Sequence, residues 1–141
     1  MRWTIFFLGL LLPAAVWGQT PRVPAQNVCL QGLSALSTFD PWGGPIIYYC
    51  EPVLWQYRPQ TVTFLFAHEE THVALHITAM AQAWTLAGRD PEAEADQGAI
   101  AMLAGSFSPQ DWGVVLSDIS RRNPAIAQRV ATLLRAQGIP F

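Results

Sequence analysis

A chain of 141 residues suits a single domain, and a composition with 51% hydrophobic and only 13% charged residues argues against global disorder. The formal net charge of −2 is too small to favour nucleic acid or an anionic membrane surface as a partner. We therefore expect a folded domain with no nucleic-acid partner.

The first eighteen residues have the pattern of a secretory signal peptide. Arg2 gives a short positive start, an apolar run follows from Trp3 to Trp17, and Gly18 is a small residue suited to cleavage before Gln19. A retained membrane anchor is the alternative, but the run is short for a full span and a proline interrupts it. We expect residues 1–18 to be removed and the protein to be secreted or periplasmic, without stable membrane association.

Two cysteines, Cys29 and Cys50, follow this segment. In an oxidising compartment an even pair usually forms a disulfide. The bridge would close a loop of about twenty residues and stabilise the fold by roughly 3 kcal/mol. Metal binding is the alternative, but two lone cysteines so far apart are a weak zinc signal.

The next segments in chain order predict a leader and then a strand. Residues 19–27 are polar with two prolines, which is typical of an extended, poorly ordered leader. Residues 28–44 mix short apolar pieces with turn formers. Residues 45–55 are rich in β-branched and aromatic side chains and predict a strand, with Pro52 favouring an edge or an end. We expect 19–44 to be a leader and turn region and 45–141 to be the functional domain.

About four helices are predicted after this strand. Apolar residues recur at spacings of three and four, uninterrupted until Gly88, which predicts a long helix over about 60–87. Asp-Pro, Ser-Pro and Asn-Pro pairs then mark three further helix starts. These helices are expected to run from about 90 to 103, from about 108 to 120, and from about 123 to just before Gly138. The predicted class is α+β, mainly helical, with a small N-terminal β element.

The long predicted helix carries a pattern that suits metal chemistry. His68 and His72 are four residues apart, so they lie one turn apart on the same face. Two imidazoles at this spacing can both bind one zinc ion at about 2 Å. Glu69 lies beside the first of them and can take a proton from a water that zinc has acidified. The pattern therefore predicts a zinc centre that activates water at neutral pH.

A catalytic zinc needs a third protein ligand. Glu92 lies about twenty residues after His72, at a predicted helix start, and can reach the metal if the two helices pack side by side. Asp96 lies one turn further on the same face and can accept the free imidazole N–H of a ligand histidine. Glu94 is the alternative ligand, although Asp96 would then face elsewhere.

Two motifs carry a resemblance to a known family. The His-Glu-Glu-Thr-His run from His68 to His72 and the Glu-Ala-Glu-Ala-Asp run from Glu92 to Asp96 resemble the paired motifs of the gluzincin metallopeptidases. The resemblance implies that His68, His72 and Glu92 are zinc ligands. It also implies that Glu69 is the general base and acid, and that Asp96 orients a ligand histidine.

The small size and the order of elements are similar to the minigluzincins, which are single-domain peptidases with a zincin-like fold. In that family an edge strand ahead of the zinc helix aligns an extended peptide by strand addition. The resemblance implies that residues from Ile46 to Cys50 form this strand and that the substrate is a peptide or protein.

Several further residues are candidates with less defined roles. His76 continues the histidine row, but it lies about 12 Å from His68 by helical rise, too far to share the zinc. A packed histidine is the simplest interpretation, and a substrate contact is the alternative. Glu70 points away from both ligand histidines. The candidate donors for a transition-state oxyanion are Tyr48, Tyr49, His76, Arg121 and Arg122.

These observations predict a secreted zinc-dependent peptidase that hydrolyses peptide bonds through a zinc-activated water. The alternative is a secreted binding protein that zinc stabilises without catalysis, since the same ligands can hold a structural metal in a small chain. A helical domain without metal is the third possibility.

Overall fold

The computed structural model describes residues 20–76 and 88–141. The expected signal peptide, residues 1–18, lies outside the described residues. So does most of the second half of the long helix that was expected over about 60–87.

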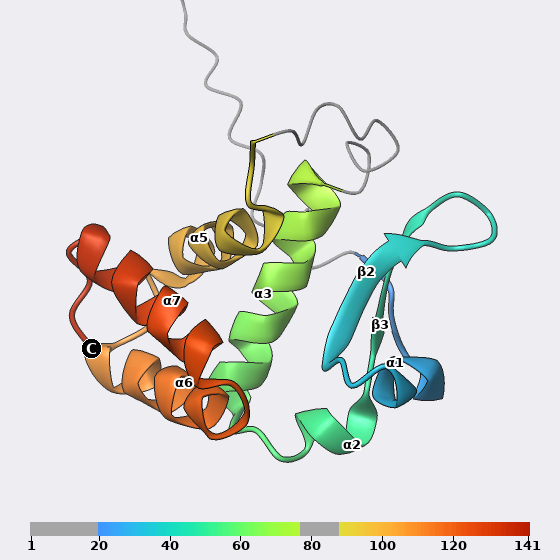
Figure 1. The fold of residues 1–141 in the computed structure, drawn as a ribbon. Helices are drawn as coiled ribbons and strands as arrows, with labels where there is room; N and C mark the ends of the chain where they lie inside the picture. The colour runs from blue at the N-terminus through green and yellow to red at the C-terminus, as the bar shows by residue number, and fades with distance from the viewer. Residues whose placement is uncertain (1–19, 77–87) are drawn as a thin grey trace, which may run out of the picture.

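A small sheet is formed by β1 (Arg22–Pro24), β2 (Ala35–Phe39) and β3 (Pro45–Tyr49) in the order β1-β3-β2. β1 is parallel to β3 and β2 is antiparallel to it, with Ser37 opposite Ile47. Figure 1 shows the sheet on one side of α3. The prediction that Ile46 to Cys50 form an edge strand is therefore wrong, because the preceding segment supplies a strand to each side of β3.

The expected extended leader over 19–27 is also wrong for its described residues. They form β1 and then the short helix α1 (Gln26–Leu30), on which Val28 is fully buried. Backbone hydrogen bonds from Ile47 N to Pro21 O and from Ala25 N to Tyr49 O, both 2.9 Å long, join this segment to β3. Prolines are tolerated here because β1 is an edge strand and needs few N–H donors.

The strand predicted over 45–55 is too long. β3 ends at Tyr49, and the short helix α2 (Glu51–Leu54) begins directly after Cys50. Pro52 lies in the first turn of α2, where a missing N–H is of no consequence. Cys50 forms the predicted disulfide with Cys29, at a Cα–Cα distance of 4.9 Å. A disulfide of this kind is typical of an extracellular or otherwise oxidising environment.

Four longer helices follow: α3 (Pro59–Leu75), α5 (Pro91–Leu103), α6 (Pro109–Arg122) and α7 (Pro124–Ala136). Their starts confirm the predicted signals. The side chains of Asp90 and Asn123 accept from Ala93 N and Ile126 N, and Ser108 forms a capping box. α3 ends at Leu75, so the unbroken helix predicted to about 87 is wrong at this point.

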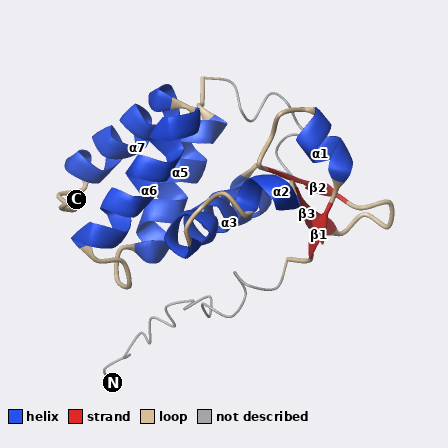
Figure 2. Cartoon of the chain, turned by 90° about the horizontal axis from the view of Figure 1, so that it is seen from below, coloured by secondary structure: helices blue, strands red, loops and turns tan. Residues whose placement is uncertain are grey.

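α3 lies between the sheet and the other long helices (Figures 1 and 2). On its helical side it packs into the main core, which includes Phe64, Ala67, Ile100, Trp112, Val115, Val130 and Leu134. The predicted fold class, α+β and mainly helical with a small N-terminal sheet, is confirmed. None of the helices in the described residues is long and apolar enough to cross a membrane.

Candidate metal centre

α5 lies very close to α3, and this brings the two sequence motifs together. Gly98 on α5 faces Thr71 on α3, and a Cβ atom at position 98 would lie only 2.4 Å from Thr71 Cγ2. The small buried residues Ala67, Ala95 and Ala99 line the same two helices. Since the helices can approach closely, residues at the start of α5 reach the histidine face of α3.

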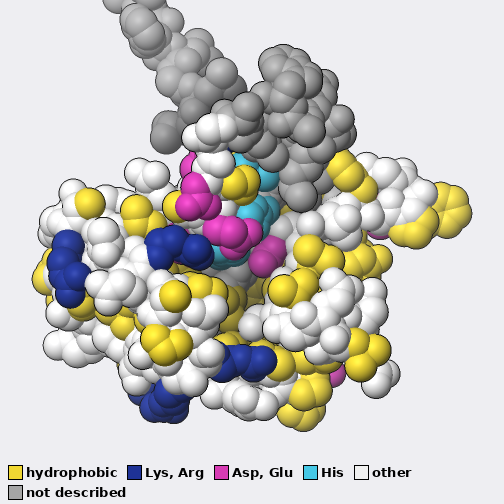
Figure 3. Space-filling view, in the orientation of Figure 1, with side chains coloured by type: hydrophobic (Ala, Val, Ile, Leu, Met, Phe, Trp, Pro, Cys, Tyr) yellow, Lys and Arg dark blue, Asp and Glu magenta, His cyan; other side chains and the backbone are white. Residues whose placement is uncertain are grey.

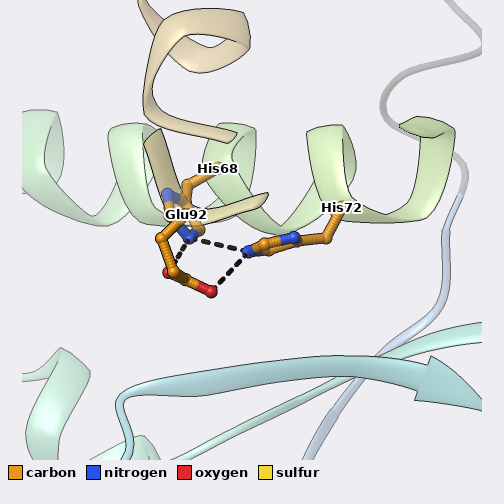
Figure 4. A group of neighbouring side chains, drawn as sticks. All are labelled: His68, His72 and Glu92. Carbon is orange, nitrogen blue, oxygen red and sulfur yellow. Dashed lines mark hydrogen bonds and ion pairs between the residues drawn. The ribbon is translucent and has the colours of Figure 1, made fainter. Parts of the chain in front are cut away.

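Three side chains converge where α5 begins (Figure 4). His68 Nε2 lies 3.0 Å from His72 Nε2. One oxygen of Glu92 lies 3.2 Å from His68 Nε2, and the other lies 3.2 Å from His72 Nε2. The structure thus places the three predicted ligands in one cluster that could hold a metal ion.

The spacing of the two histidine nitrogens suits a tetrahedral site. Ligand atoms bound about 2.0–2.1 Å from a tetrahedral ion stand roughly 3.3 Å apart. The observed separation of 3.0 Å between the two Nε2 atoms is close to this value, and the carboxylate of Glu92 spans both rings with one oxygen 3.2 Å from each. Two imidazoles and a carboxylate form a donor set that suits zinc and other transition metals better than calcium or magnesium.

Asp96 contacts His68, the candidate ligand nearest to it on α3. Its Oδ1 lies 2.7 Å from His68 Nδ1, and its other oxygen accepts from Arg129 Nε at 2.6 Å. Asp96 is only 1% exposed, and these two contacts give each of its oxygens a partner. An N–H at His68 Nδ1 leaves Nε2 with a lone pair for a metal. Arg129 on α7 was not identified from sequence, because no local pattern indicates its contact with α5.

The carboxylates around the cluster favour the protonated form of His68 when no metal is bound. Burial alone would lower the pKa of His68, but the carboxylates of Asp96 and Glu92 outweigh it and raise that pKa to about 9. Hydrogen bonds from His68 and His72 hold the pKa of Glu92 well below its usual range. A cation is therefore stabilised at this position, and a metal ion would replace a proton there.

His76 lies on the far side of His72 from Glu92. It is fully buried, and its Nδ1 lies 2.9 Å from His72 Nδ1. Its Nε2 lies 3.5 Å from Glu94 Oε2, and Arg89 holds the pKa of Glu94 down to about 2. Burial lowers the pKa of His76, as does the neighbouring His72. His76 is thus a packed histidine that contacts a candidate ligand, and Glu94 reaches His76 rather than the cluster.

Glu69 is 9% exposed and lies under β2. Ser37 donates two hydrogen bonds to Glu69 Oε2, from its backbone N at 2.9 Å and from its hydroxyl. Glu69 Oε1 has no hydrogen-bond partner among the described residues. One oxygen of the predicted general base is thus fixed, and the other remains available. Ser37 was not identified from sequence, since nothing in the 19–44 segment marks it.

Two cavities flank the cluster, and both are lined by Glu69 and Glu92. The first, of about 310 Å³, extends between α3, α6 and α7 past Tyr57, Phe64 and Arg122. The second, of about 410 Å³, runs along β2 and includes His72. Figure 3 shows histidine and acidic side chains gathered in a hollow between the helices and the sheet. The cluster therefore opens to space on both sides.

The remaining predicted candidates lie elsewhere. Tyr49 packs edge-to-face on Phe66 with ring centroids 5.6 Å apart, and neither Tyr48 nor Tyr49 lines the two cavities. Arg121 lies 3.9 Å from Asp118, whereas Arg122 lines the first cavity.

Glu70 points away from the cluster toward β1, as expected. It accepts a 2.6 Å hydrogen bond from Thr20 Oγ1, and Arg22 lies 3.8 Å away. Burial raises the pKa of Glu70. Its contacts join the metal-centre helix to the N-terminal segment.

The chain was compared with protein-family models, curated proteins and solved structures, and no match was found. The residues of the cluster and their geometry are therefore what indicates a function for this chain.

Proposed function

We propose that this protein is a zinc-dependent peptidase of the gluzincin type, with His68, His72 and Glu92 as zinc ligands. The observation that carries the proposal is the position of Glu69. Its buried carboxylate lines both cavities beside the three side chains that could hold a metal, and one of its oxygens is held by Ser37. A purely structural metal site would not need this carboxylate.

Zinc bound here would supply Lewis-acid polarisation of a peptide carbonyl and would acidify a water molecule. Glu69 then accepts the proton of the attacking water on its available oxygen. The same carboxylate returns a proton to the leaving amine nitrogen, so one water is consumed for each peptide bond broken. Asp96 and Arg129 hold His68 throughout, so the ligand need not reorient during the reaction.

The position of β2 at an edge of the sheet supports an extended peptide as the substrate. Ser37 N points away from β3 because it donates to Glu69, so Ala35 and Phe39 also direct their backbone groups outward. A peptide can add to such an edge through main-chain hydrogen bonds. β2, rather than the predicted Ile46 to Cys50, is thus the strand suited to this role, and it borders the second cavity.

We also propose that the protein is exported and acts outside the cytoplasm. The apolar N-terminal run suits a signal peptide, and the Cys29–Cys50 disulfide is consistent with an oxidising compartment.

The test is zinc analysis combined with peptide-library cleavage for the wild type and Glu69→Gln. We expect one zinc per chain in both proteins, and hydrolysis at least about 100-fold slower in Glu69→Gln. Glu51→Gln makes the same chemical change at an exposed, remote position and serves as the control. Retained cleavage in Glu69→Gln would contradict the mechanism. Zinc binding and stabilisation without cleavage of any peptide would instead support the zinc-stabilised binding protein.

A further inference from the structure

The three histidines of the chain form one continuous row on α3 and its C-cap. His68 and His72 direct their Nε2 atoms to the cluster with Glu92. In Figure 4 the second ring nitrogen of His72 points away from Glu92. That nitrogen, Nδ1, lies 2.9 Å from His76 Nδ1. His76 is fully buried, so this contact is shielded from water.

Metal binding at His72 determines where the protons in this row must lie. A metal takes the lone pair of Nε2, so the neutral ring keeps its proton on Nδ1 and must donate it. The nearest acceptor is His76 Nδ1, which therefore carries no proton. The proton of His76 then lies on Nε2, a buried atom with no hydrogen-bond partner in the described part of the chain.

Glu94 is placed to complete the row. Its Oε2 lies 3.5 Å from His76 Nε2, and a small movement would convert this contact into a hydrogen bond. Arg89 holds the Glu94 carboxylate through two hydrogen bonds, from Nε at 2.8 Å and from a terminal nitrogen at 2.5 Å. The negative charge that faces His76 is thus anchored.

The two ligand histidines are then held by equivalent arrangements. His68 Nδ1 contacts Asp96, whose other oxygen is held by Arg129. His72 Nδ1 contacts His76, which faces Glu94 and, beyond it, Arg89. Each acidic residue of the 92–96 segment therefore contacts a histidine. Glu94, which is not among the three candidate ligands, contacts His76.

We propose that His76 and Glu94 are positioning residues that hold His72 in the tautomer and orientation needed for metal binding. This inference rests on the proposed zinc site but not on catalysis. Loss of a partner that orients a ligand histidine typically weakens metal affinity about 10- to 100-fold.

The experiment measures the zinc dissociation constant by competition with a chromophoric chelator, and the visible spectrum of the cobalt-substituted protein. His76→Phe keeps a buried ring but removes the acceptor, and we expect zinc to bind about 10- to 100-fold more weakly with an altered cobalt spectrum. His76→Asn places an amide oxygen near the position of Nδ1, and we expect it to recover most of the affinity. Glu94→Gln is expected to give a smaller loss with His76 in place.

Two controls separate positioning from general damage. Thermal unfolding of each metal-free variant shows whether the variant is folded. A residue that only positions a metal ligand should leave the unfolding temperature of the metal-free protein unchanged. Arg89→Gln removes the partner of Glu94 but leaves the carboxylate facing His76, and we expect it to change affinity less than Glu94→Gln does.

The possible failures are distinguishable. A wild-type protein that binds no zinc contradicts the proposed zinc site, whereas zinc binding without cleavage contradicts only the proposed catalysis. Wild-type zinc affinity and cobalt spectrum in both folded His76→Phe and Glu94→Gln would overturn the positioning role. If His76→Phe does not fold, wild-type zinc affinity and cobalt spectrum in Glu94→Gln overturn the positioning role, and a weakened affinity in Glu94→Gln supports it.

Discussion

Ser37 places the general-base candidate through two hydrogen bonds to a single oxygen of Glu69. Ser37→Ala removes the hydroxyl donor but keeps the backbone donor of β2. We predict that kcat falls about 10-fold while zinc affinity stays unchanged, because a hydrogen bond to a charged group contributes roughly 1.5–3 kcal/mol and Glu69 is not a ligand. Steady-state kinetics together with a zinc titration checks this.

The control for Ser37 is its neighbour Thr38, whose side chain points to the opposite face of β2. Thr38→Ala makes a similar change in size on the same strand and should leave kcat unaltered. An equal loss of kcat in both variants would show that β2 as a whole, rather than the Ser37 hydroxyl, is responsible.

Individual site residues could be predicted where they lie one helical turn from another site residue on the same helix. His68 and His72 are set by helix periodicity, and Asp96 follows from Glu92 by one turn of the next helix. Ser37 and Arg129 could not be predicted, because each reaches the site from an element that is distant in sequence. Ser37 lies on β2 and Arg129 on α7, and neither residue type stands out from its surroundings.

At the scale of elements, the approach of α5 to α3 determines whether the cluster forms. A Cβ at position 98 would lie 2.4 Å from Thr71 Cγ2 and 2.6 Å from its Oγ1, so Gly98→Ala must push the helices apart. We predict a loss of about 1–3 kcal/mol in the free energy of unfolding and weaker zinc binding, since α5 carries Glu92 and Asp96. Urea unfolding and a zinc titration measure the two effects.

Gly113 on α6 provides the matched control, because nothing lies within 4 Å of a Cβ placed there. Gly113→Ala should raise stability by about 0.5–1 kcal/mol, as alanine is the better helix former. Thr71→Ala combined with Gly98→Ala removes two of the clashing atoms and should recover part of the loss. If Gly98→Ala behaves like Gly113→Ala, close helix approach is not a constraint on the site.

The N-cap residue of α3 is Arg58, whose side chain accepts no hydrogen bond from the first turn. Asp118 of α6 supplies acceptors to this end of α3 instead. It accepts from Arg58 N at 3.0 Å, from the Arg58 guanidinium at 2.7 Å and from Thr61 Oγ1 at 2.7 Å. Burial alone would raise the pKa of Asp118, but these donors, Arg58 foremost, lower it to about 2. α3 is thus anchored to the helical bundle by a carboxylate that must stay ionised.

Acid should therefore weaken the fold through Asp118. Its folded pKa of about 2 lies below the unfolded value of about 3.9, so its contribution is present above about pH 4 and is lost as the pH falls toward 2. We predict that Asp118→Asn lowers stability at pH 7 and flattens the decline between pH 4 and pH 2. Urea unfolding of both proteins across that range is the measurement, and parallel curves would contradict the assignment.

Element boundaries were predictable where the sequence carries local signals. Capping residues followed by proline located the starts of α5, α6 and α7, because these residues satisfy or remove the unpaired N–H groups of a first turn. The change from β3 to α2 at Cys50 could not be read from β-branched and aromatic content, which suits a longer strand equally well. Likewise, apolar periodicity gave no sign that α3 ends at Leu75.

At the scale of the whole molecule, α3 lies between the helical bundle and the sheet, and the two parts differ in how far they depend on local sequence signals. The bundle on one face is built from local helix signals, whereas the sheet on the other face combines the local pair of β2 and β3 with β1, which is distant from β3 in sequence. Strand pairing between β1 and β3 spans about 25 residues, so polar, proline-containing residues 20–24 looked like a leader when considered alone. Such non-local pairing is the part of the fold that composition and periodicity cannot supply.

The Cys29–Cys50 disulfide closes the loop that contains both β2 and β3. With a sequence separation of 21 residues, the chain-entropy model gives a stabilisation of about 3 kcal/mol. We predict that the metal-free protein loses about this much free energy of unfolding on reduction. The loss should affect function as well, because loosening β2 releases Ser37 from Glu69 and disturbs the strand that borders the second cavity.

Urea unfolding of oxidised and reduced protein measures this effect, with a phosphine reductant and without zinc, so that thiol reagents do not compete for the metal. The double variant Cys29→Ala/Cys50→Ala should resemble the reduced wild type and should not respond to reductant. Equal stability of the oxidised and reduced wild type would show that the sheet holds β2 in place without the bridge. A stability loss without any change in the Ser37-dependent kcat would limit the disulfide to a role in the fold, separate from the positioning of Glu69.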